Sequence, residues 1–528
     1  MTAAILSLPV ALAFGLQSGL GAASGIYTAI ILGTVTSIFG ATKAIISDPA
    51  GPITIVSTLI VSSALAQKGD LENAMPIIVG TFVLAGLIQI VFGVIKVAKY
   101  VRYISYPVLS GFMSGIGVII ILFQWNSLTG HAGQKSIRTI LTHLYEPFIN
   151  PNVNAMLLGG ICLALIYLIP LLSKRVPAGI VAIVITTVIS RFLPPTFAVL
   201  GEIPSSVPTL KYQAIAGFKW TDLPLIFSGA ITIASLGTIN TLLTAVAADS
   251  RTKTKHKGNL ELVGQGLGNI ITALFGGLPG AGGTVGTLAN INAGGRTRIS
   301  GFVKVGFLIL ILLGAGPFVK YIPIPVIAAL LFSIGIRIMD FKGIGKLIKI
   351  RNSDLLVLLT VVFLTVFSDL LVAIGVGMVL SSFFFMQRMG DIVEEQTKYG
   401  ELGKMERKLK VPKFLKSMIY VMELDGPLFY GFSDEFKTEA RKVKGKAAVL
   451  VNMSSVPYMD ASGIFMLEEI ISEFQNLQVE VVLVGVKPHI FKNFEDLKLI
   501  PNILSEEHVY NKVGAGVKYL VDKLTHEI

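Results

Sequence analysis

The fold of this chain is decided by Ser47-Asp48-Pro49-Ala50-Gly51-Pro52, which lead into Ile53-Thr54-Ile55-Val56-Ser57-Thr58. A second stretch of the same design is Leu278-Pro279-Gly280-Ala281-Gly282-Gly283, which leads into Thr284-Val285-Gly286-Thr287-Leu288-Ala289-Asn290. Each predicts an extended lead-in that becomes a helix partway across a membrane. Matching interrupted segments in two halves of a chain indicate a transporter's substrate site. A helix N-terminus inside the bilayer suits an anion, because it offers unpaired N–H groups and a partial positive charge.

The composition places most of the chain in lipid. The 528 residues are 53% hydrophobic and only 14% charged, with a mean hydropathy of +0.73, whereas soluble domains carry roughly 25% charged residues. The net charge of +12 fits basic loops on one membrane face, and no aromatic-basic motif predicts a nucleic-acid partner. No catalytic or nucleotide-binding motif is present, so we expect neither an enzyme nor a bound cofactor. The one cysteine, Cys162, lies in an apolar segment and predicts no disulfide.

Apolar segments divide the first part of the chain, residues 1–388, into a predicted transmembrane domain. We place fourteen of them, several shorter than the roughly 20 residues of a full span; they are 1–17, 24–40, 52–66, 75–95, 105–123, 154–171, 178–193, 226–247, 259–276, 283–293, 299–317, 323–339, 354–368 and 369–386. The two interrupted segments are the third and the tenth, which is the third of each seven. This spacing predicts two repeats of seven, and an odd repeat length makes the second repeat inverted.

Basic residues predict the orientation of this domain. With an even number of spans, both termini lie on one side of the membrane. Lys and Arg concentrate in the loops on that side, with clusters at 96–102, 251–257 and 337–351, while the opposite loops hold few. Because cytoplasmic loops carry the excess of Lys and Arg, both termini are predicted to be cytoplasmic. We expect an integral protein of a bacterial inner membrane, surrounded by lipid.

The composition changes after Arg388. Residues 389–413 are polar and charged and predict a linker with some helical character, and residues 414–528 predict a small cytoplasmic α/β domain. In that domain we expect strands at 417–424, 447–451 and 479–484, with helices at 461–474 and 514–523. Asp460-Ala461-Ser462-Gly463 opens the first of these helices, so Asp460 is a predicted N-cap and Ser462 a candidate regulatory phosphorylation site.

Hydroxyl side chains line the two interrupted helices. Thr54, Ser57 and Thr58 share one face of the first, and Thr284 and Thr287 share one face of the second. They either contact the substrate or bond back to helix carbonyls, and their place beside Pro and Gly breaks favours contact. In the eighth segment Asn240 and Thr244 also share a face and could line the same cavity; a hydrogen bond between helices is the alternative role for Asn240. The centres of segments one, three, eight and ten hold no charged residue, which favours a site built from helix dipoles and hydroxyls.

Several motifs resemble the SulP (sulfate permease) family of anion transporters; they are the Pro-x-Gly-Pro lead-in, the basic stretch 248–257, Gly264-Gln265-Gly266-Leu267-Gly268-Asn269, Leu274-Phe275-Gly276-Gly277 and residues 290–297. The C-terminal domain resembles a STAS domain, with Asp460-x-Ser462-Gly463 at its phosphoacceptor loop. Within the family, residues 110–117 and the Gly282-x-Thr284-x-Gly286-Thr287 core are most similar to sodium-dependent bicarbonate transporters.

The resemblance implies an α-helical, seven-plus-seven inverted repeat with core and gate domains, working as an elevator and as a homodimer. It implies that the substrate lies between the third and tenth helices, in contact with Ala50, Gly283 and Thr284; the patterns above add Thr54 and Thr287. It also implies a cation site at Asn240, Thr244, Gly282 and Thr284, with sodium as the coupling ion.

This sequence departs from the family pattern at four places. Asn240 stands where the sodium-dependent members have Asp, and Ala50 where they have Thr. Gly286 replaces an Arg of many members, which favours a monovalent anion such as bicarbonate over sulfate. The first predicted span begins almost at Met1, so the cytoplasmic lead-in of the family is missing from this sequence.

Three functional hypotheses follow. The first is a secondary transporter of a small inorganic anion, with bicarbonate ahead of sulfate or chloride. The second is a nucleobase symporter of similar repeat architecture, which would need a carboxylate that segments eight and ten lack. The third is a membrane-anchored regulator that signals through its STAS domain. Two matched broken helices favour the first, with the STAS domain binding a regulatory partner.

Overall fold

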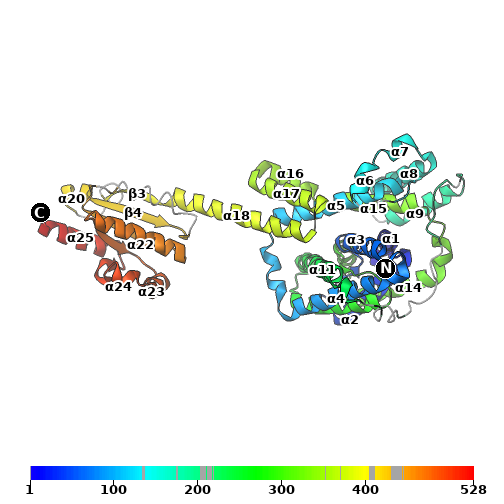
Figure 1. Ribbon diagram of the computed structural model, residues 1–528, viewed down its shortest axis with the longest axis horizontal. Coiled ribbons are helices and arrows are strands. Elements are labelled where there is room, and N and C mark those ends of the chain that lie inside the picture. The colour runs from blue at the N-terminus through cyan, green and yellow to red at the C-terminus, as the bar shows by residue number, and fades with distance from the viewer. Residues whose placement is uncertain are drawn as a thin grey trace. The chain divides into compact units, whose positions relative to one another are not determined.

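The structure is a computed structural model that describes residues 2–133, 137–173, 177–194, 196–201, 210, 217, 219–350, 352–368, 370–402, 411–429, 443 and 445–527. The chain forms two compact units, Met1–Ser381 and Ser382–Ile528 (Figure 1). The division falls inside a helix, several residues before the predicted end of the transmembrane domain at 388.

A helix covers each of the fourteen predicted apolar segments. In chain order they are α1 (Thr2–Gln17), α2 (Ala22–Phe39), α3 (Gly51–Lys68), α4 (Leu71–Val94), α5 (Tyr106–Leu128), α8 (Val153–Leu172), α9 (Ala178–Ser190), α11 (Leu223–Thr252), α12 (Gly258–Leu274), α13 (Thr284–Asn292), α14 (Ile299–Val319), α15 (Ile324–Ile338), α17 (Asn352–Phe367) and α18 (Leu370–Gln396). Among the described residues, seven helices are long and apolar enough to cross a membrane, and four shorter ones are apolar.

Shorter helices lie between these segments in places where we predicted only loops. They are α6 (Ile137–Thr142), α7 (Glu146–Ile149), α16 (Phe341–Ile350) and the 3-10 turns Val97–Lys99, Val101–Tyr103 and Trp220–Asp222. Their polar or short sequences carry no membrane-length apolar run, which is why hydropathy alone did not predict them.

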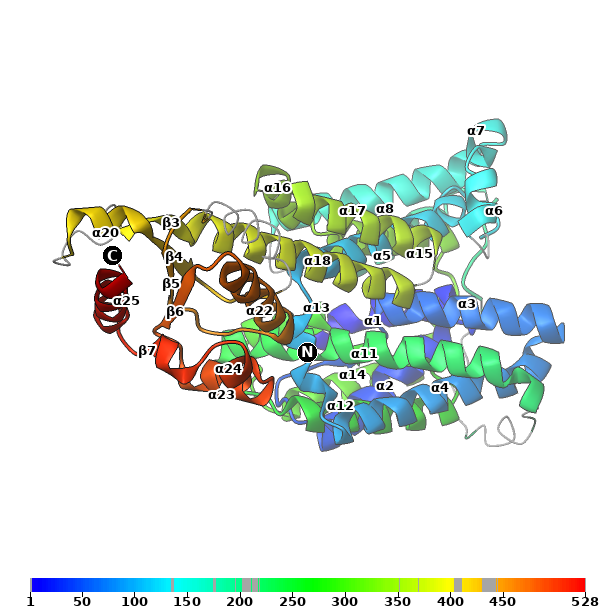
Figure 2. The same cartoon turned by 60° about the vertical axis from the view of Figure 1, so that its left-hand side comes forward.

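The helices of the first unit fall into two groups (Figure 2). Helices α1–α4 pack with α11–α14, while α5, α8, α9, α15 and α17 pack among themselves. Each group takes the corresponding part of both sets of seven, as expected for a repeat fold with two intertwined halves. Glycines allow the closest crossings: a Cβ on Gly25 of α2 would lie 1.8 Å from the Ala11 carbonyl of α1, and one on Gly266 of α12 would lie 2.5 Å from the Gly86 carbonyl of α4.

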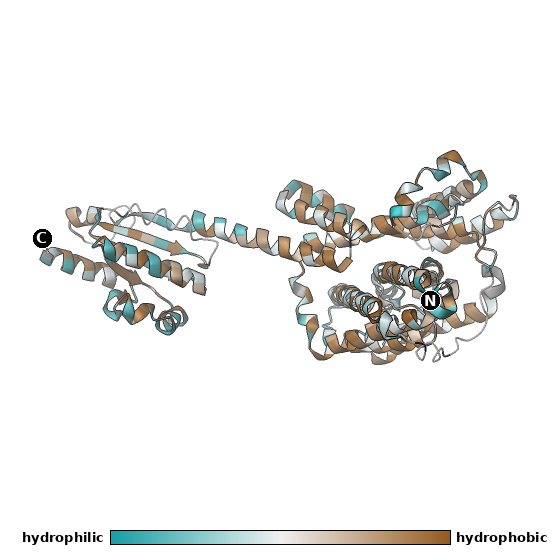
Figure 3. Cartoon of the chain, viewed as in Figure 1, coloured by the Kyte–Doolittle hydropathy of each residue, from teal (hydrophilic) through white to brown (hydrophobic). Residues whose placement is uncertain are grey.

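The outer faces of many of these helices are apolar (Figure 3). Leu171 and Leu172 of α8 are 81% and 88% exposed. Large exposed apolar surfaces of this kind are rare on soluble monomers and are expected where lipid covers a protein. The first unit is therefore an integral membrane domain.

The second unit is built on one five-stranded sheet in the order β3-β4-β5-β6-β7. The strands are β3 (Lys398–Glu401), β4 (Ile419–Asp425), β5 (Ala448–Ser455), β6 (Glu480–Val484) and β7 (Val509–Tyr510); β3 is antiparallel to β4, and the other pairs are parallel. The helices are α20 (Lys413–Met418), α22 (Ala461–Asn476), α23 (Pro488–Asp496), α24 (Leu499–Asn502) and α25 (Val513–Glu527).

Helices cover both faces of this sheet. Met422 of β4 packs in a core with Ile470 of α22, whereas its neighbour Val421 packs in a second core with Leu520 of α25. Successive strand residues point to opposite faces, so both faces are apolar and both are buried. Near one edge of the sheet, Glu480 accepts hydrogen bonds from His508 (2.8 Å) and Tyr519 (3.1 Å). It also forms an ion pair with Lys523 at 2.7 Å.

Two details of the predicted second unit were wrong. The strand predicted from Ser417 begins at Ile419, because α20 includes Ser417. The predicted linker 389–413 is structured at its start, since α18 continues to Gln396 and β3 joins the sheet. Residues 403–410 of that linker lie outside the described residues. A short polar strand such as β3 is stabilised by its neighbour β4 and leaves little signal in its own sequence.

Candidate functional site

The two interrupted stretches cross each other in the structure. Strand β1 (Ser47–Asp48) pairs antiparallel with β2 (Ala281–Gly282), Ser47 opposite Gly282 and Asp48 opposite Ala281. Helix α3 begins three residues after β1, and α13 begins two residues after β2. Because the strands are antiparallel, the helices continue away from the crossing in opposite directions and both N-termini flank it. The predicted extended lead-ins, each followed directly by a helix, are confirmed; that these helices begin partway across the membrane stays a prediction.

Ala50 and Gly283 are the N-cap residues of these helices. Their carbonyls accept the first helical hydrogen bonds, from Thr54 N–H (2.8 Å) and Thr287 N–H (2.9 Å). The N–H groups between cap and first bonded residue have no partner within the helix, and they belong to Gly51 and Ile53 of α3 and to residues 284–286 of α13, since Pro52 has no N–H. Donors from two helices therefore converge beside the crossing.

The Thr54 hydroxyl lies on the first full turn of α3 and is completely buried. Among the described residues its Oγ1 atom has no hydrogen-bond partner. Thr58 and Ser57, one turn further on, instead donate back to the carbonyls of Thr54 (2.8 Å) and Ile53 (2.9 Å). Of the three hydroxyls on this face, that of Thr54 is the one without a hydrogen bond among the described residues.

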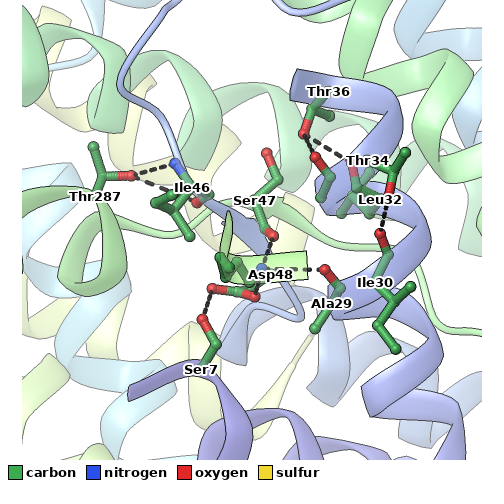
Figure 4. Close-up of polar contacts among 12 residues, drawn as sticks. Ser7, Ala29, Ile30, Leu32, Thr34, Thr36, Ile46, Ser47, Asp48 and Thr287 are labelled. Carbon is green, nitrogen blue, oxygen red and sulfur yellow. Dashed lines mark hydrogen bonds and ion pairs between the residues drawn. The ribbon is translucent and has the colours of Figure 1, made fainter. Parts of the chain in front are cut away.

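Thr287 has a different role from the one its spacing predicted. Its hydroxyl accepts a hydrogen bond from Ile46 N–H at 2.9 Å and lies 3.5 Å from Ile46 O (Figure 4). Asn290, one turn later, donates to Ala44 O at 3.1 Å. These contacts bind α13 to the chain that enters β1, so Thr287 positions the crossing.

The glutamine and asparagine of the motif at 264–269 hold the crossing from α12. Gln265 donates to the Ser47 hydroxyl at 2.6 Å. Asn269 accepts from Gly280 N–H (2.8 Å) and donates to Gly280 O (3.2 Å). One helix therefore fixes both lead-ins, which explains why these polar residues lie in an apolar segment.

The four residues of the predicted cation site lie together. Asn240 Nδ2 and Thr244 Oγ1 donate to Gly282 O at 3.2 and 2.8 Å, and the Thr244 and Thr284 hydroxyls are 2.6 Å apart. Since the Thr244 hydrogen is directed to Gly282 O, the Thr284 hydroxyl is the donor to Thr244. The Thr244 oxygen thus lies within hydrogen-bonding distance of those of Gly282 and Thr284, and oxygen is the ligand atom that a hard cation prefers. Elsewhere in the described part of the chain, no three His, Cys, Asp or Glu side chains gather to hold a metal.

A buried ion pair borders the crossing and was not predicted. Lys304 of α14 forms an ion pair with Asp48. Ser7 of α1 donates to the other Asp48 oxygen at 2.6 Å (Figure 4). Lys304 Nζ also donates to Ser47 O (2.8 Å) and Ala29 O (3.2 Å). The available signal was Lys304 itself, a lone charge in the apolar run 299–317, because charges inside a membrane are costly and usually paired.

A second buried carboxylate, Glu261 of α12, lies next to this network. It accepts from Ala41 N–H and Thr42 N–H, both at 2.7 Å, and neighbours Gln265, whose Nε2 lies 3.4 Å away. Glu261 was predicted only as part of an apolar segment. Glu261 therefore provides the hydrogen-bond acceptor for the backbone N–H groups just after α2, and it fixes the residues that lead to β1.

A cavity of about 590 Å³ lies beyond the first turns of α3, between the two helix groups. Its polar lining residues include Gln17, Thr58, Ser62, Gln124, Ser127 and His131. Both polar atoms of Gln17 are buried without a partner among the described residues. These polar groups would line an aqueous path between the two helix groups.

Ser462 lies in the second unit, exposed in the first turn of α22. Asp460 caps that helix by accepting from Gly463 N–H at 2.7 Å. The predicted N-cap is thus confirmed, while phosphorylation of Ser462 stays a prediction.

Both units match families of known proteins. The Sulfate permease family profile matches residues 1–361, and the STAS domain profile matches residues 414–516. The bicarbonate transporter BicA of Picosynechococcus sp. is 33% identical over 550 residues, which cover 99% of this chain and 95% of that protein. The solved transmembrane domain of a cyanobacterium bicarbonate transporter BicA has 38% identity and a TM-score of 0.65, over 70% of this chain and 94% of that one. The murine anion transporter Slc26a9, in its inward-facing state, shares the fold, with a TM-score of 0.82 at 17% identity over 98% and 90% of the two chains.

Proposed function

Because this chain belongs to the Sulfate permease family of anion transporters and carries a C-terminal STAS domain, we propose that it moves bicarbonate across the membrane by secondary transport. The anion binds between the N-termini of α3 and α13. It contacts the backbone N–H groups after Ala50 and Gly283, including that of Thr284, and the hydroxyl of Thr54. Family and relatives are transporters, so the chain is not an enzyme.

The observation that carries this proposal is the β1–β2 crossing, which brings two helix N-termini to one place. Each terminus stabilises an anion by up to about 2 kcal/mol when partly buried. Binding of that strength suits a carrier, because the ion must also leave. The Asp48–Lys304 pair is neutral as a whole, so no uncompensated positive side chain adds to the site. Transport of sulfate or chloride at the same site is the alternative.

Sodium coupling belongs to the same proposal. The ion would bind the oxygens of Thr244, Gly282 and Thr284, together with that of Asn240 once its amide turns away from Gly282 O, next to the N-terminus of α13. All four groups are neutral, so we expect weaker sodium dependence than a site with a carboxylate would give. A sodium ion here would add positive charge close to the bound anion, which is the physical basis for coupling.

The wider mechanism is proposed from the family. The helix group α1–α4 with α11–α14 carries the site and would move as the elevator core against the second group. The protein works as a homodimer in a bacterial inner membrane with both termini in the cytoplasm, and the STAS unit, with Ser462, binds a regulatory partner.

The test is uptake of labelled bicarbonate by proteoliposomes that contain the full chain, with and without an inward sodium gradient. Unlabelled sulfate and chloride serve as competitors, and liposomes without protein give the background. Saturable bicarbonate uptake above background supports the proposal, and stimulation by the gradient supports the cation site. Uptake of sulfate or chloride without bicarbonate would overturn the substrate while keeping the anion site.

A further inference from the structure

The Asp48 carboxylate lies at the edge of the proposed anion site. Asp48 and Ala50 are two residues apart in extended backbone, so their side chains leave the chain on the same side. A Cβ placed on Gly286 would be 3.4 Å from Asp48 Oδ2, and one on Gly283 would be 3.8 Å from it. Gly283 and Gly286 belong to the N-cap and first turn of α13. A carboxylate therefore faces the helix end that is proposed to bind an anion.

A negative charge in this position opposes anion binding unless it is neutralised, and Lys304 neutralises it. The lysine has three N–H donors, and its three acceptors are Asp48 Oδ1, Ser47 O and Ala29 O. No donor of Lys304 is left for a ligand. Its contribution is to compensate the charge of Asp48 and to fix its orientation, not to bind the anion.

The carboxylate retains capacity to accept hydrogen bonds. Two oxygens offer about four lone-pair positions; Lys304 uses one on Oδ1, and Ser7 uses one on Oδ2. Oδ2 is the oxygen that faces Gly286, and no side chain of α13 covers it there; a Cβ on Gly286 would lie 3.4 Å from Oδ2 and 3.3 Å from Ile46 Cγ2. The site thus combines N–H donors from two helix ends with one carboxylate acceptor.

We propose that Asp48 is a specificity-determining residue, whose Oδ2 accepts the O–H of a hydrogen-bearing monovalent oxyanion. This inference rests on the proposed function and deepens it. Bicarbonate has one O–H to give and two further oxygens for the N–H donors. Nitrate has nearly the same planar shape but no hydrogen, and chloride and sulfate have none either. A site with a fixed polar partner for a substrate O–H rejects the analogue that lacks it.

The experiment compares bicarbonate with nitrate in the full-length protein. Uptake of labelled bicarbonate is measured in proteoliposomes at a mildly alkaline pH, and the inhibition constant of nitrate is divided by that of unlabelled bicarbonate. In the wild type we expect this ratio to be about tenfold or more, the factor for one hydrogen bond to a charged group. In Asp48→Asn the ratio should fall toward one, because Lys304 holds the amide oxygen and the amide N–H₂ then offers a donor to either anion.

Two further variants make the result decisive. Removing one partner of a buried ion pair destabilises a protein, so Asp48→Leu/Lys304→Met, which removes both charges together and leaves no acceptor at position 48, should show the same fall. The matched control is Asp222→Asn, which alters another buried carboxylate with a lysine partner, Lys68 at 3.0 Å. That pair lies at the other end of α3, about 26 Å along the helix from its N-terminus, and the ratio should stay at the wild-type value.

The outcomes separate the inference from the function on which it rests. A wild type that takes up no bicarbonate overturns the proposed function together with this substrate. A protein that transports bicarbonate with an unchanged ratio in both Asp48 variants overturns the role of Asp48 alone. A fall of the ratio in Asp222→Asn as well would also overturn it, because the effect would then follow from loss of any buried carboxylate.

Discussion

Substitution of Thr54 by valine tests whether the Thr54 hydroxyl contacts the ligand or only contributes to the fold. Valine has the shape of threonine without the hydroxyl, so the packing of the first turn of α3 is kept. The Thr54 hydroxyl is fully buried and has no partner among the described residues. Such a group either only destabilises the folded state or also forms a hydrogen bond with a ligand. The two cases predict different effects of the substitution on KM.

The expected effects on stability and binding have opposite signs. A buried polar group without a hydrogen bond costs about 1–3 kcal/mol, so Thr54→Val should leave the free energy of unfolding unchanged or raise it by up to that amount. If the hydroxyl donates to the anion, its loss removes a hydrogen bond to a charged group of about 1.5–3 kcal/mol. The KM for bicarbonate should then rise by a factor of about 10 to 150.

The assay is concentration-dependent bicarbonate uptake together with thermal unfolding in detergent. Thr81→Val is the matched control, because Thr81 is equally buried but donates to Ile77 O at 2.7 Å. It should leave KM unchanged. An unaltered KM in Thr54→Val would refute the assignment of Thr54 to the anion site, and a large loss of thermal stability would refute the description of its hydroxyl as unpaired.

Three further changes have expected outcomes. Thr284→Val removes the hydroxyl that donates to Thr244; it should reduce sodium stimulation of uptake several-fold without lowering membrane abundance, whereas Thr284→Ser should retain it. Gly25→Ala places a Cβ 1.8 Å from a backbone carbonyl and should cost about 1–3 kcal/mol or more, seen as loss of folded protein, while Gly160→Ala, with open space around it, should be harmless. Burial of Glu480 acts to raise its pKa, but its hydrogen bonds outweigh this and hold the pKa below the usual value. Its stabilisation is thus present above the usual pKa and lost as pH falls through the lower folded value; amide hydrogen exchange in β6 should accelerate less on acidification in Glu480→Gln than in the wild type.

The sequence was sufficient for the features that depend on local chemistry. Pro49 and Pro52 lack the N–H that a ladder or a helix interior needs, but proline is favoured in the first turn of a helix, so they predicted where β1 ends and α3 begins. Apolar runs predicted the membrane helices, since lipid requires their length and composition. In the second unit, Asp460 before an amphipathic run predicted the start of α22, because an Asp side chain caps the first turn of a helix.

What the sequence did not reveal depends on partners far along the chain. Asp48 and Lys304 are 256 residues apart, and neither alone indicates that the other compensates it. Thr287 has the same helical spacing whether it contacts a ligand or Ile46, so only the fold distinguishes the two. The hydroxyls of Ser57 and Thr58 likewise match the substrate pattern, yet they bond to their own helix.

The charge balance of the site bears on the choice of anion. Each helix N-terminus carries about half a positive charge, so the ends of α3 and α13 together offer about one. The Asp48–Lys304 pair contributes no net charge. Without a bound sodium ion, one monovalent anion balances this site, whereas sulfate would leave about one negative charge uncompensated in a medium of low dielectric constant, which is strongly unfavourable. Chloride is therefore a stronger rival to bicarbonate than sulfate is, and we expect it to compete better in the uptake assay at equal concentration. Stronger competition by sulfate would show that a further positive charge reaches the site, for example by separation of Lys304 from Asp48.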